Sequence, residues 1–296
     1  MSKPLKILLQ TTLRYDEDDW HAGRFSLLVD HLRSLTTADG NRLCEVANRN
    51  REEDENGDDR VLRTLDEADF DQLWLFALDQ GEGLTPSDCA GITRFRKRGG
   101  SILSARDHND MGSSLCTLGG IGAAHYFNAK NRDPDESRNC RDDQDSPDID
   151  YPNYHSGWNG DYQKIEATDH ELFRRTDGSL IEYFPAHVHE GGIGAPDGSA
   201  QVVARGKSLT TGRDFNLVVA FDHSTDSHGR SLGRAIAESS FHHFVDYNWD
   251  LSKGCPTFLS SVDTPGDGIA REPGKLDDVK RYVENAVRWL GGVSGS

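Results

Sequence analysis

Short, mostly apolar runs punctuate the chain and predict its strands. The runs at 6–11, 72–78 and 101–104 are short and bounded by polar residues, which is typical of strands buried on both faces of a parallel sheet. Residues 42–47 form a weaker apolar run of the same kind, and residues 234–239 supply a late one. We therefore predict five strands, of which four (6–11, 72–78, 101–104 and 234–239) should be parallel neighbours.

Apolar residues recur at helical spacing in two segments, 20–35 and 275–290. A third helix is predicted from Thr85 to about Arg98, because Thr85 can cap its first turn and Gly99-Gly100 can end it. Strands that alternate with helices indicate a parallel sheet covered by helices on both faces. The chain is therefore predicted to be an α/β protein with a flavodoxin-like sheet.

Two regions depart from this alternation. Residues 126–160 are polar and acid-rich and lack a core of their own, so we interpret them as a long insertion over one edge of the sheet. Residues 200–206 and 215–221 are apolar runs joined by a short polar segment, which predicts an antiparallel hairpin. We expect one domain, 1–296, that carries both features.

The charge of the chain bears on its partners, and its cysteines bear on its compartment. The chain has 33 basic and 50 acidic residues, a net charge of −17, and such a surface repels phosphates and anionic lipid. We therefore expect no nucleic-acid and no membrane partner. The first apolar run is too short for a signal peptide, and Arg49 to Arg60 read as a polar surface loop. Five scattered cysteines without a CxxC pair predict free thiols in a reducing cytoplasm.

The order of elements, with Gly99-Gly100 before one strand and Phe241-His242 after another, resembles a known group. It is similar to the ThuA-like branch of the class I glutamine-amidotransferase-like superfamily, named for a trehalose-utilisation protein. The resemblance covers most of residues 5–292 apart from the insertion, and it implies a flavodoxin-like fold.

The same resemblance implies that the chain lacks glutamine amidotransferase activity. In the amidotransferases a Cys follows the Gly-Gly strand and a His-Pro-Glu follows the late strand. Here Ala105 follows the Gly-Gly strand, and His243 and Phe244 stand in place of the Pro and the Glu. Cys116 lies eleven residues past Ala105, and we interpret it as a buried cysteine at a helix start rather than as a displaced nucleophile.

A polar run, Arg106-Asp107-His108-Asn109-Asp110, follows the third parallel strand, at the edge where open α/β sheets bind ligands. Asp107 and Asp110 would orient His108 or contact sugar hydroxyls, and Arg106 would hold an anion. The alternative is a polar turn in which Asp110 caps the next helix.

A second candidate is His187-Val-His189-Glu190, followed by two glycines. In an extended segment His187 and His189 face the same side, the spacing that metal ligands use, and Glu190 is a possible third ligand. The alternative is a pair of histidines that anchor a loop through hydrogen bonds. The glycines would permit a ligand to approach the backbone closely. We assign no metal, and the sequence identifies no cofactor.

The third candidate is His242-His243 with Asn248. An imidazole titrates near neutral pH, so His242 suits an acid/base role, and the aromatic and amide residues that follow it suit a sugar ring. Core packing explains those aromatic residues equally well. Residues 154–160 fit a lid over the site or a surface loop.

Together these patterns predict an enzyme that acts on a small hydroxyl-rich, carbohydrate-like molecule. The predicted catalytic residues are His242, Asp107 and His108. The predicted substrate-binding residues are Arg106, Asp110, His187, His189, Glu190, His243 and Asn248. The alternative is a catalytically silent ligand-binding or regulatory protein of the same fold, and a homo-oligomer is compatible with the sequence.

Overall fold

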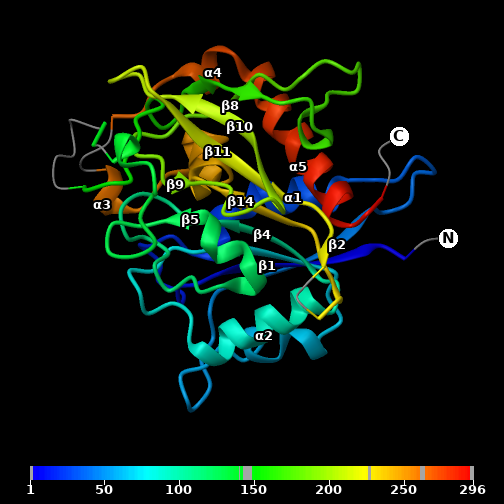
Figure 1. Cartoon of the computed structure of the whole chain (residues 1–296). Coiled ribbons are helices and arrows are strands. Elements are labelled where there is room, and N and C mark those ends of the chain that lie inside the picture. The colour runs from blue at the N-terminus through cyan, green and yellow to red at the C-terminus, as the bar shows by residue number, and fades with distance from the viewer. Residues whose placement is uncertain (1–2, 140, 143–148, 226–227, 261–263, 294–296) are drawn as a thin grey trace.

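A computed structural model describes residues 3–139, 141–142, 149–225, 228–260 and 264–293, and it is built on one eight-stranded sheet (Figure 1). The strand order is β2-β1-β3-β4-β14-β11-β10-β7. These strands are β1 (Leu5–Thr11), β2 (Cys44–Arg49), β3 (Gln72–Phe76), β4 (Ser101–Ala105), β7 (Glu166–Ala167), β10 (Ala200–Lys207), β11 (Asp214–Phe221) and β14 (Ala235–Glu238).

Five of these strands are parallel and adjacent, from β2 to β14. The predicted neighbours β1, β3, β4 and β14 lie side by side in that order, so this prediction is confirmed. The predicted hairpin of β10 and β11 also forms. It is not a separate unit, because β11 pairs antiparallel with β14 and extends the main sheet.

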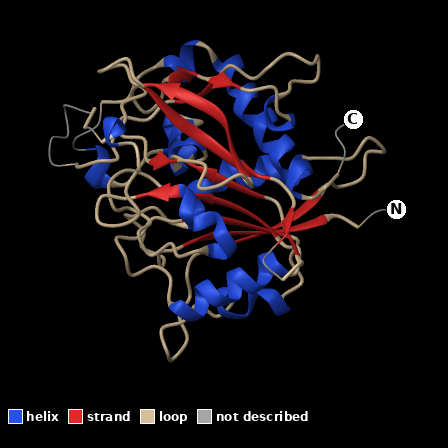
Figure 2. Ribbon diagram, viewed as in Figure 1, coloured by secondary structure: helices blue, strands red, loops and turns tan. Residues whose placement is uncertain are grey.

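Helices cover both faces of the sheet (Figures 1 and 2). On one face lie α1 (Ser26–Ser34) and α5 (Leu276–Leu290), and on the other lies α2 (Pro86–Lys97). The predicted Thr85 cap is present, since its hydroxyl accepts from the Asp88 amide. The helix predicted at 20–35 is shorter than expected. The segment begins with a 3₁₀ turn, Ala22–Phe25, and the His21 side chain caps this turn by accepting from the Gly23 amide.

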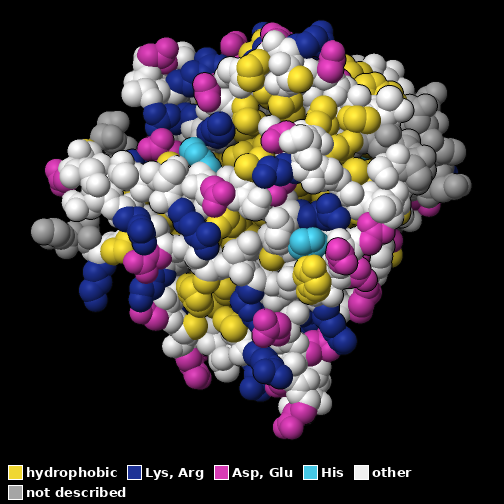
Figure 3. All heavy atoms as spheres, turned by 180° about the vertical axis from the view of Figure 1, so that it is seen from behind, with side chains coloured by type: hydrophobic (Ala, Val, Ile, Leu, Met, Phe, Trp, Pro, Cys, Tyr) yellow, Lys and Arg dark blue, Asp and Glu magenta, His cyan; other side chains and the backbone are white. Residues whose placement is uncertain are grey.

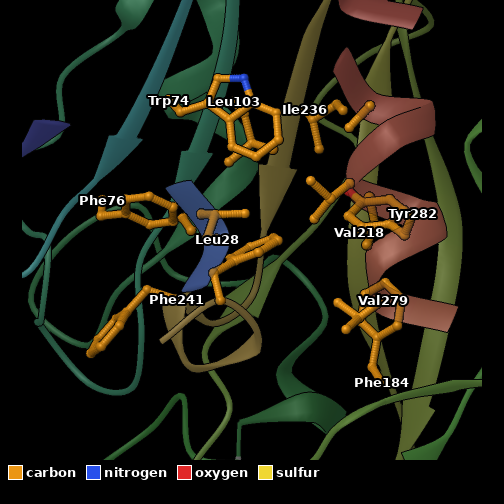
Figure 4. Packing of buried hydrophobic residues seen from close by; sticks show 14 of the residues in the cluster. Leu28, Trp74, Phe76, Leu103, Phe184, Val218, Ile236, Phe241, Val279 and Tyr282 are labelled. Atoms are coloured by element: carbon orange, nitrogen blue, oxygen red, sulfur yellow. The ribbon is translucent and has the colours of Figure 1, made fainter. Parts of the chain in front are cut away.

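The larger core lies between the sheet and the helices α1 and α5 (Figure 4). Phe76 of β3 stacks on Phe25 with ring centroids 4.3 Å apart, and Tyr282 of α5 packs against Phe184. Ile236 of β14 lies in this core as well. The core therefore holds β14 firmly against β4, and this fixes where the segments that follow the two strands emerge.

Short elements complete the fold. Three two-stranded sheets pair β5 (His125–Tyr126) with β9 (Gly192–Ile193), β6 (Tyr162–Lys164) with β8 (Tyr183–Pro185), and β12 (Ser224–Thr225) with β13 (Ser231–Leu232). Two short helices, α3 (Thr257–Ser260) and α4 (Gly268–Arg271), precede α5.

The segment predicted as an insertion, 126–160, stays outside the main sheet as expected, except that residues 140 and 143–148 lie outside the described residues. Its later part is not a solvated surface loop, and its role as a lid over the site stays a prediction. Tyr154 is buried and stacks on Phe215 of β11, and Asn159 is fully buried. Because the segment is polar overall, its sequence did not predict that these two residues are buried.

The prediction that 49–60 is a solvated loop is also only partly right. Arg51 and Asp59 are buried, and Arg51 Nη1 lies 2.7 Å from the Asp88 carboxylate at the start of α2. Arg49 Nη1 lies 2.8 Å from Asp59 Oδ1. Charged residues in a polar run are normally solvated, but here opposite charges pair and become buried together.

Cys89 and Cys116 form a disulfide, which corrects the prediction of free thiols. Cys89 lies in α2, and the bond ties that helix to the segment after β4. Cys116 is therefore neither a buried free cysteine nor a thiol nucleophile, and it is half-buried. Cysteine usage no longer supports a reducing cytoplasm, so a cytoplasmic location stays a prediction without that support.

We expect the Cys89→Ser/Cys116→Ser double variant to unfold with a free energy about 3 kcal/mol lower than the wild type. The reason is that the bond closes a loop between residues 27 positions apart, which restricts the unfolded chain. Urea unfolding of both proteins measures the difference, and a peptide map without reductant checks the bond. A map without the linked peptide would contradict this prediction.

No helix in the described part of the chain is long and apolar enough to span a membrane. The net charge of −17 does not produce a uniformly acidic surface. On the face seen in Figure 3, lysine and arginine side chains lie among the acidic ones, with apolar side chains between them.

Candidate functional site

Two chain segments leave the sheet side by side at the carboxyl ends of β4 and β14. The two strands lie side by side (Figure 1). Glu238 of β14 pairs in register with Ala105 of β4, so Asp107 and His242 emerge at the same edge. A third segment, the loop between β8 and β9, brings His187 and His189 to this edge. With His108, which follows Asp107, five of the predicted site residues therefore converge, although they come from distant parts of the sequence.

The Asp107 carboxylate is the centre of this cluster and is fully buried. Its Oδ2 lies 2.8 Å from His108 Nδ1, 3.2 Å from His187 Nε2 and 3.7 Å from His242 Nε2. Its Oδ1 accepts a hydrogen bond of 2.7 Å from Ser240 Oγ. Burial alone would raise the pKa of Asp107, but the adjacent imidazoles of His187, His108 and His242 hold it well below its usual range.

The four imidazoles are packed against one another in two orientations. The His187 and His242 rings are stacked, with centroids 3.6 Å apart and planes 11° apart. His189 stands edge-on to His187 at 4.8 Å and to His108 at 4.6 Å. Burial and the neighbouring His187 lower the pKa of His242 well below its ordinary value. His242 is therefore a neutral imidazole at neutral pH.

Backbone groups behind the cluster fix which His187 nitrogen carries a proton. Asn248 Oδ1 accepts from the Gly160 amide, so its Nδ2 faces the His242 carbonyl and Asn159 Oδ1 as a donor. Asn159 Oδ1 is thus an acceptor, and His187 Nδ1, 2.9 Å away, must donate to it. The His187 Nε2 atom then faces Asp107.

A second buried network lies beneath the cluster. His243 Nε2 lies 3.2 Å from Glu190 Oε2, and its Nδ1 lies 3.5 Å from Glu238 Oε2. The Tyr282 hydroxyl donates to the other oxygen of Glu238. Burial alone would lower the pKa of His243, but Glu190 and Glu238 raise it to about 10. A charged His243 between the two carboxylates connects β14, α5 and the His187–Glu190 loop.

The predicted site residues thus divide into two groups. Asp107, His108, His187, His189 and His242 meet in the cluster. The remaining predicted residues bond to other parts of the protein: Arg106 donates to backbone carbonyls, Asp110 accepts from the Ala129 amide, Glu190 and His243 form the network below, and Asn248 holds Asn159. Substrate contact by this second group stays a prediction.

Sequence reasoning missed Asn159 and Ser240. Both touch the cluster directly, through His187 and Asp107. Asn159 lies at the end of the polar insertion, where its neighbours gave no periodic signal. Ser240 lies two residues after the end of β14 and caps the turn that presents His242. A polar residue at the end of a central strand was the available signal for Ser240.

Gly191 allows a close approach of backbone segments rather than of a ligand. A Cβ atom at this position would lie 2.4 Å from the Asp107 carbonyl oxygen and 2.5 Å from that of Ser239. Such contacts do not occur between real atoms, so only glycine lets the His187–Glu190 loop reach the cluster.

Comparison with solved structures identifies the fold. The glutaminase domain of Trypanosoma brucei CTPS, solved with bound acivicin, superposes with a TM-score of 0.50 over 99% of this chain and 96% of that one, at 12% identity. The chain has the glutamine-amidotransferase-like fold. The N-terminal domain of mmIFT52 superposes with a TM-score of 0.51 at 13% identity, covering 98% of each chain.

A protein from Parabacteroides merdae described as ThuA-like superposes with a TM-score of 0.47 at 16% identity, covering 80% of this chain and 79% of that one. No protein-family model and no curated protein matches the sequence. At these identities the likeness extends to the glutamine-amidotransferase-like fold alone. The ThuA-like branch within that fold stays a prediction.

Proposed function

We propose that this chain is an enzyme acting on a small hydroxyl-rich, carbohydrate-like molecule at the cluster centred on Asp107. The observation that supports the proposal most strongly is the convergence of three imidazoles on one buried carboxylate, with a fourth imidazole packed against two of them, at the carboxyl edge of a parallel sheet. Imidazoles both accept from and donate to hydroxyl groups, so a site lined by them suits a substrate rich in hydroxyls.

In this proposal His242 is the general base. Its Nε2 faces Asp107, and its Nδ1 has no hydrogen-bond partner among the described residues although it is buried. A neutral imidazole in this position takes a proton from a substrate hydroxyl, and the Asp107 carboxylate stabilises the cation that results. Asp107 also orients His108, the cluster residue with a partly exposed side chain.

The proposal is tested by incubating the protein with a panel of small sugars and cyclic polyols and following each by proton NMR. We expect one class to be consumed, and the His242→Gln variant to be slower by at least about 100-fold, as for the loss of a general base. A substrate that is consumed equally fast by the variant would overturn the assignment of His242.

A catalytically silent ligand-binding or regulatory protein is the second candidate. The observation that favours it is Ala105 at the end of β4, where the resembling amidotransferases carry their nucleophile. A panel member that raises the melting temperature without being consumed would support the ligand-binding form. A protein that neither consumes nor binds any member would fit a regulatory role.

We expect no release of ammonia from glutamine above the blank. No cysteine occurs between Cys89 and Cys116 in the sequence, and these two sulfurs are joined in a disulfide. Cys44 is buried, and burial raises the pKa of its thiol to about 11, which leaves it protonated at neutral pH. A coupled ammonia assay measures the rate. Steady release that is abolished by Cys116→Ala would contradict this prediction.

A further inference from the structure

We propose that His108, His187 and His189 bind one divalent transition-metal ion of the zinc type. One ring nitrogen from each lies within 4.8 Å of the others. In a tetrahedral site with bonds of about 2.0–2.1 Å the ligand nitrogens lie about 3.4 Å apart, so binding an ion requires the longest of these separations to shorten by up to about 1.4 Å. Three imidazoles with a fourth position left open form a ligand set that catalytic zinc sites use.

Ring orientation distinguishes this set from a second one. Asp107, His187 and His242 also lie within 4.8 Å of one another. However, the planes of His187 and His242 are stacked 11° apart, so their in-plane lone pairs run parallel and do not meet. His189 is turned by 81° from His187 and by 76° from His108, which allows the lone pairs of these rings to converge. His242 therefore lies beside the ion without ligating it.

The partners behind the ligands match those of metal-bound histidines. A ligating imidazole usually donates its second N–H to a carboxylate or a carbonyl oxygen. His187 Nδ1 donates to Asn159 Oδ1 at 2.9 Å, and His108 Nδ1 lies 2.8 Å from Asp107 Oδ2. His108 thus keeps Nε2 for an ion, whereas His187 Nε2 lies 3.2 Å from Asp107 Oδ2, a contact that an ion would replace.

The alternative considered from the sequence is that His187 only anchors its loop through hydrogen bonds. The contact of 3.2 Å between His187 Nε2 and Asp107 Oδ2 fits that alternative and needs no metal ion. Titration with a metal ion distinguishes the two.

His108 is the most exposed of the three proposed ligands. Its side chain is 16% exposed, whereas those of His187 and Asp107 are at most 1% exposed. Solvent therefore comes nearest to the three proposed ligands on the side of His108. A bound ion there would lower the pKa of a water or a substrate hydroxyl next to His242.

The test is metal binding to the full chain, expressed without affinity histidines and stripped with chelator. Zn²⁺ is titrated by calorimetry, and Co²⁺ by the visible absorption that is strong only for four-coordinate cobalt. We expect one equivalent of either ion, binding at least about 100-fold weaker in His187→Ala/His189→Ala, and about 10–100-fold weaker in Asn159→Ala. His223→Ala, which removes an exposed histidine elsewhere, should leave binding unchanged.

Substoichiometric binding by the wild type, or equal affinity in the double variant, would overturn the proposal. Circular dichroism shows whether the double variant is folded. If it is not, the affinity of Asn159→Ala and the Co²⁺ spectrum of the wild type decide whether the site binds a metal ion. Unchanged affinity together with a weak, six-coordinate spectrum would then overturn it. These measurements need no substrate, so metal binding and turnover of a hydroxyl-rich molecule succeed or fail separately.

Discussion

Replacing His243 by alanine should lower the free energy of unfolding by about 3–5 kcal/mol, the usual cost of removing one partner from a buried ion pair. His243 is fully buried, with its two ring nitrogens 3.2 Å from Glu190 and 3.5 Å from Glu238. Without the imidazolium, two buried carboxyl groups lose the cation that lies between them. Urea unfolding at pH 7, followed by fluorescence, measures the effect.

Two variants serve as controls for this experiment. His223→Ala removes an exposed histidine and should change stability by no more than about 0.5 kcal/mol. Glu238→Gln should cost less than His243→Ala, because burial raises the pKa of Glu238 and so opposes its ionised form, whereas the pKa of Glu190 is lowered by His243. A loss of under about 1 kcal/mol in His243→Ala would show that the network does not stabilise the fold.

The same network predicts a pH dependence. The pKa of His243 is raised to about 10 in the folded protein, against about 6.5 in an unfolded chain. A group whose pKa is raised by folding stabilises fully below the unfolded pKa and loses that contribution as the pH rises through the folded one. Wild-type stability should therefore fall between pH 6.5 and 10. The difference between wild type and His243→Ala should shrink over the same window.

Replacing Arg106 by leucine should also cost about 3–5 kcal/mol. Arg106 is fully buried, and its guanidinium donates to the backbone carbonyls of Met111, Tyr126, His108 and Asn109 while lying 4.2 Å from the Phe127 ring centre. Leucine fills part of the space but leaves these carbonyls without their donor. The loop that carries His108 should then lose its fixed path.

Arg106→Lys is the matched variant, since it keeps the charge but not the planar fork that reaches several carbonyls. It should lie between the wild type and Arg106→Leu in urea unfolding. Hydrogen exchange of the amides of residues 107–112 reports the loop directly, and it should accelerate in Arg106→Leu. Slow exchange there in the leucine variant would show that the loop is held by other contacts.

The strands of the parallel sheet were predictable because they are short apolar runs with polar ends. The place of β14 among the parallel strands was predicted as well, but its pairing with β11 was not. The meeting of Asp107, His187 and His242 was predictable only in part: the sheet places Asp107 and His242 at one edge, but nothing in the sequence sets the path of the loop that carries His187.

Other features depended on contacts between distant residues, which no local pattern contains. The Cys89–Cys116 bond requires helix α2 to lie against the segment that follows β4. Asn159 gains its role only because Asn248 faces it across 89 positions of sequence. Glu190 was predicted as a site residue because it follows His189, yet neighbours in an extended chain point to opposite sides, and it lies in the network below instead.

The place of β14 in the sheet has a consequence for synthesis on the ribosome. β14 lies between β4 and β11, yet it follows β4 by about 130 residues and comes after β11 in the sequence. At a synthesis rate of 5–20 residues per second, β14 is made roughly 7–27 s after β4. During this time one apolar edge of β4 has no partner strand. The nascent chain is most exposed to edge-to-edge aggregation in this interval, so slow codons between residues 105 and 235 should lower the yield of soluble protein.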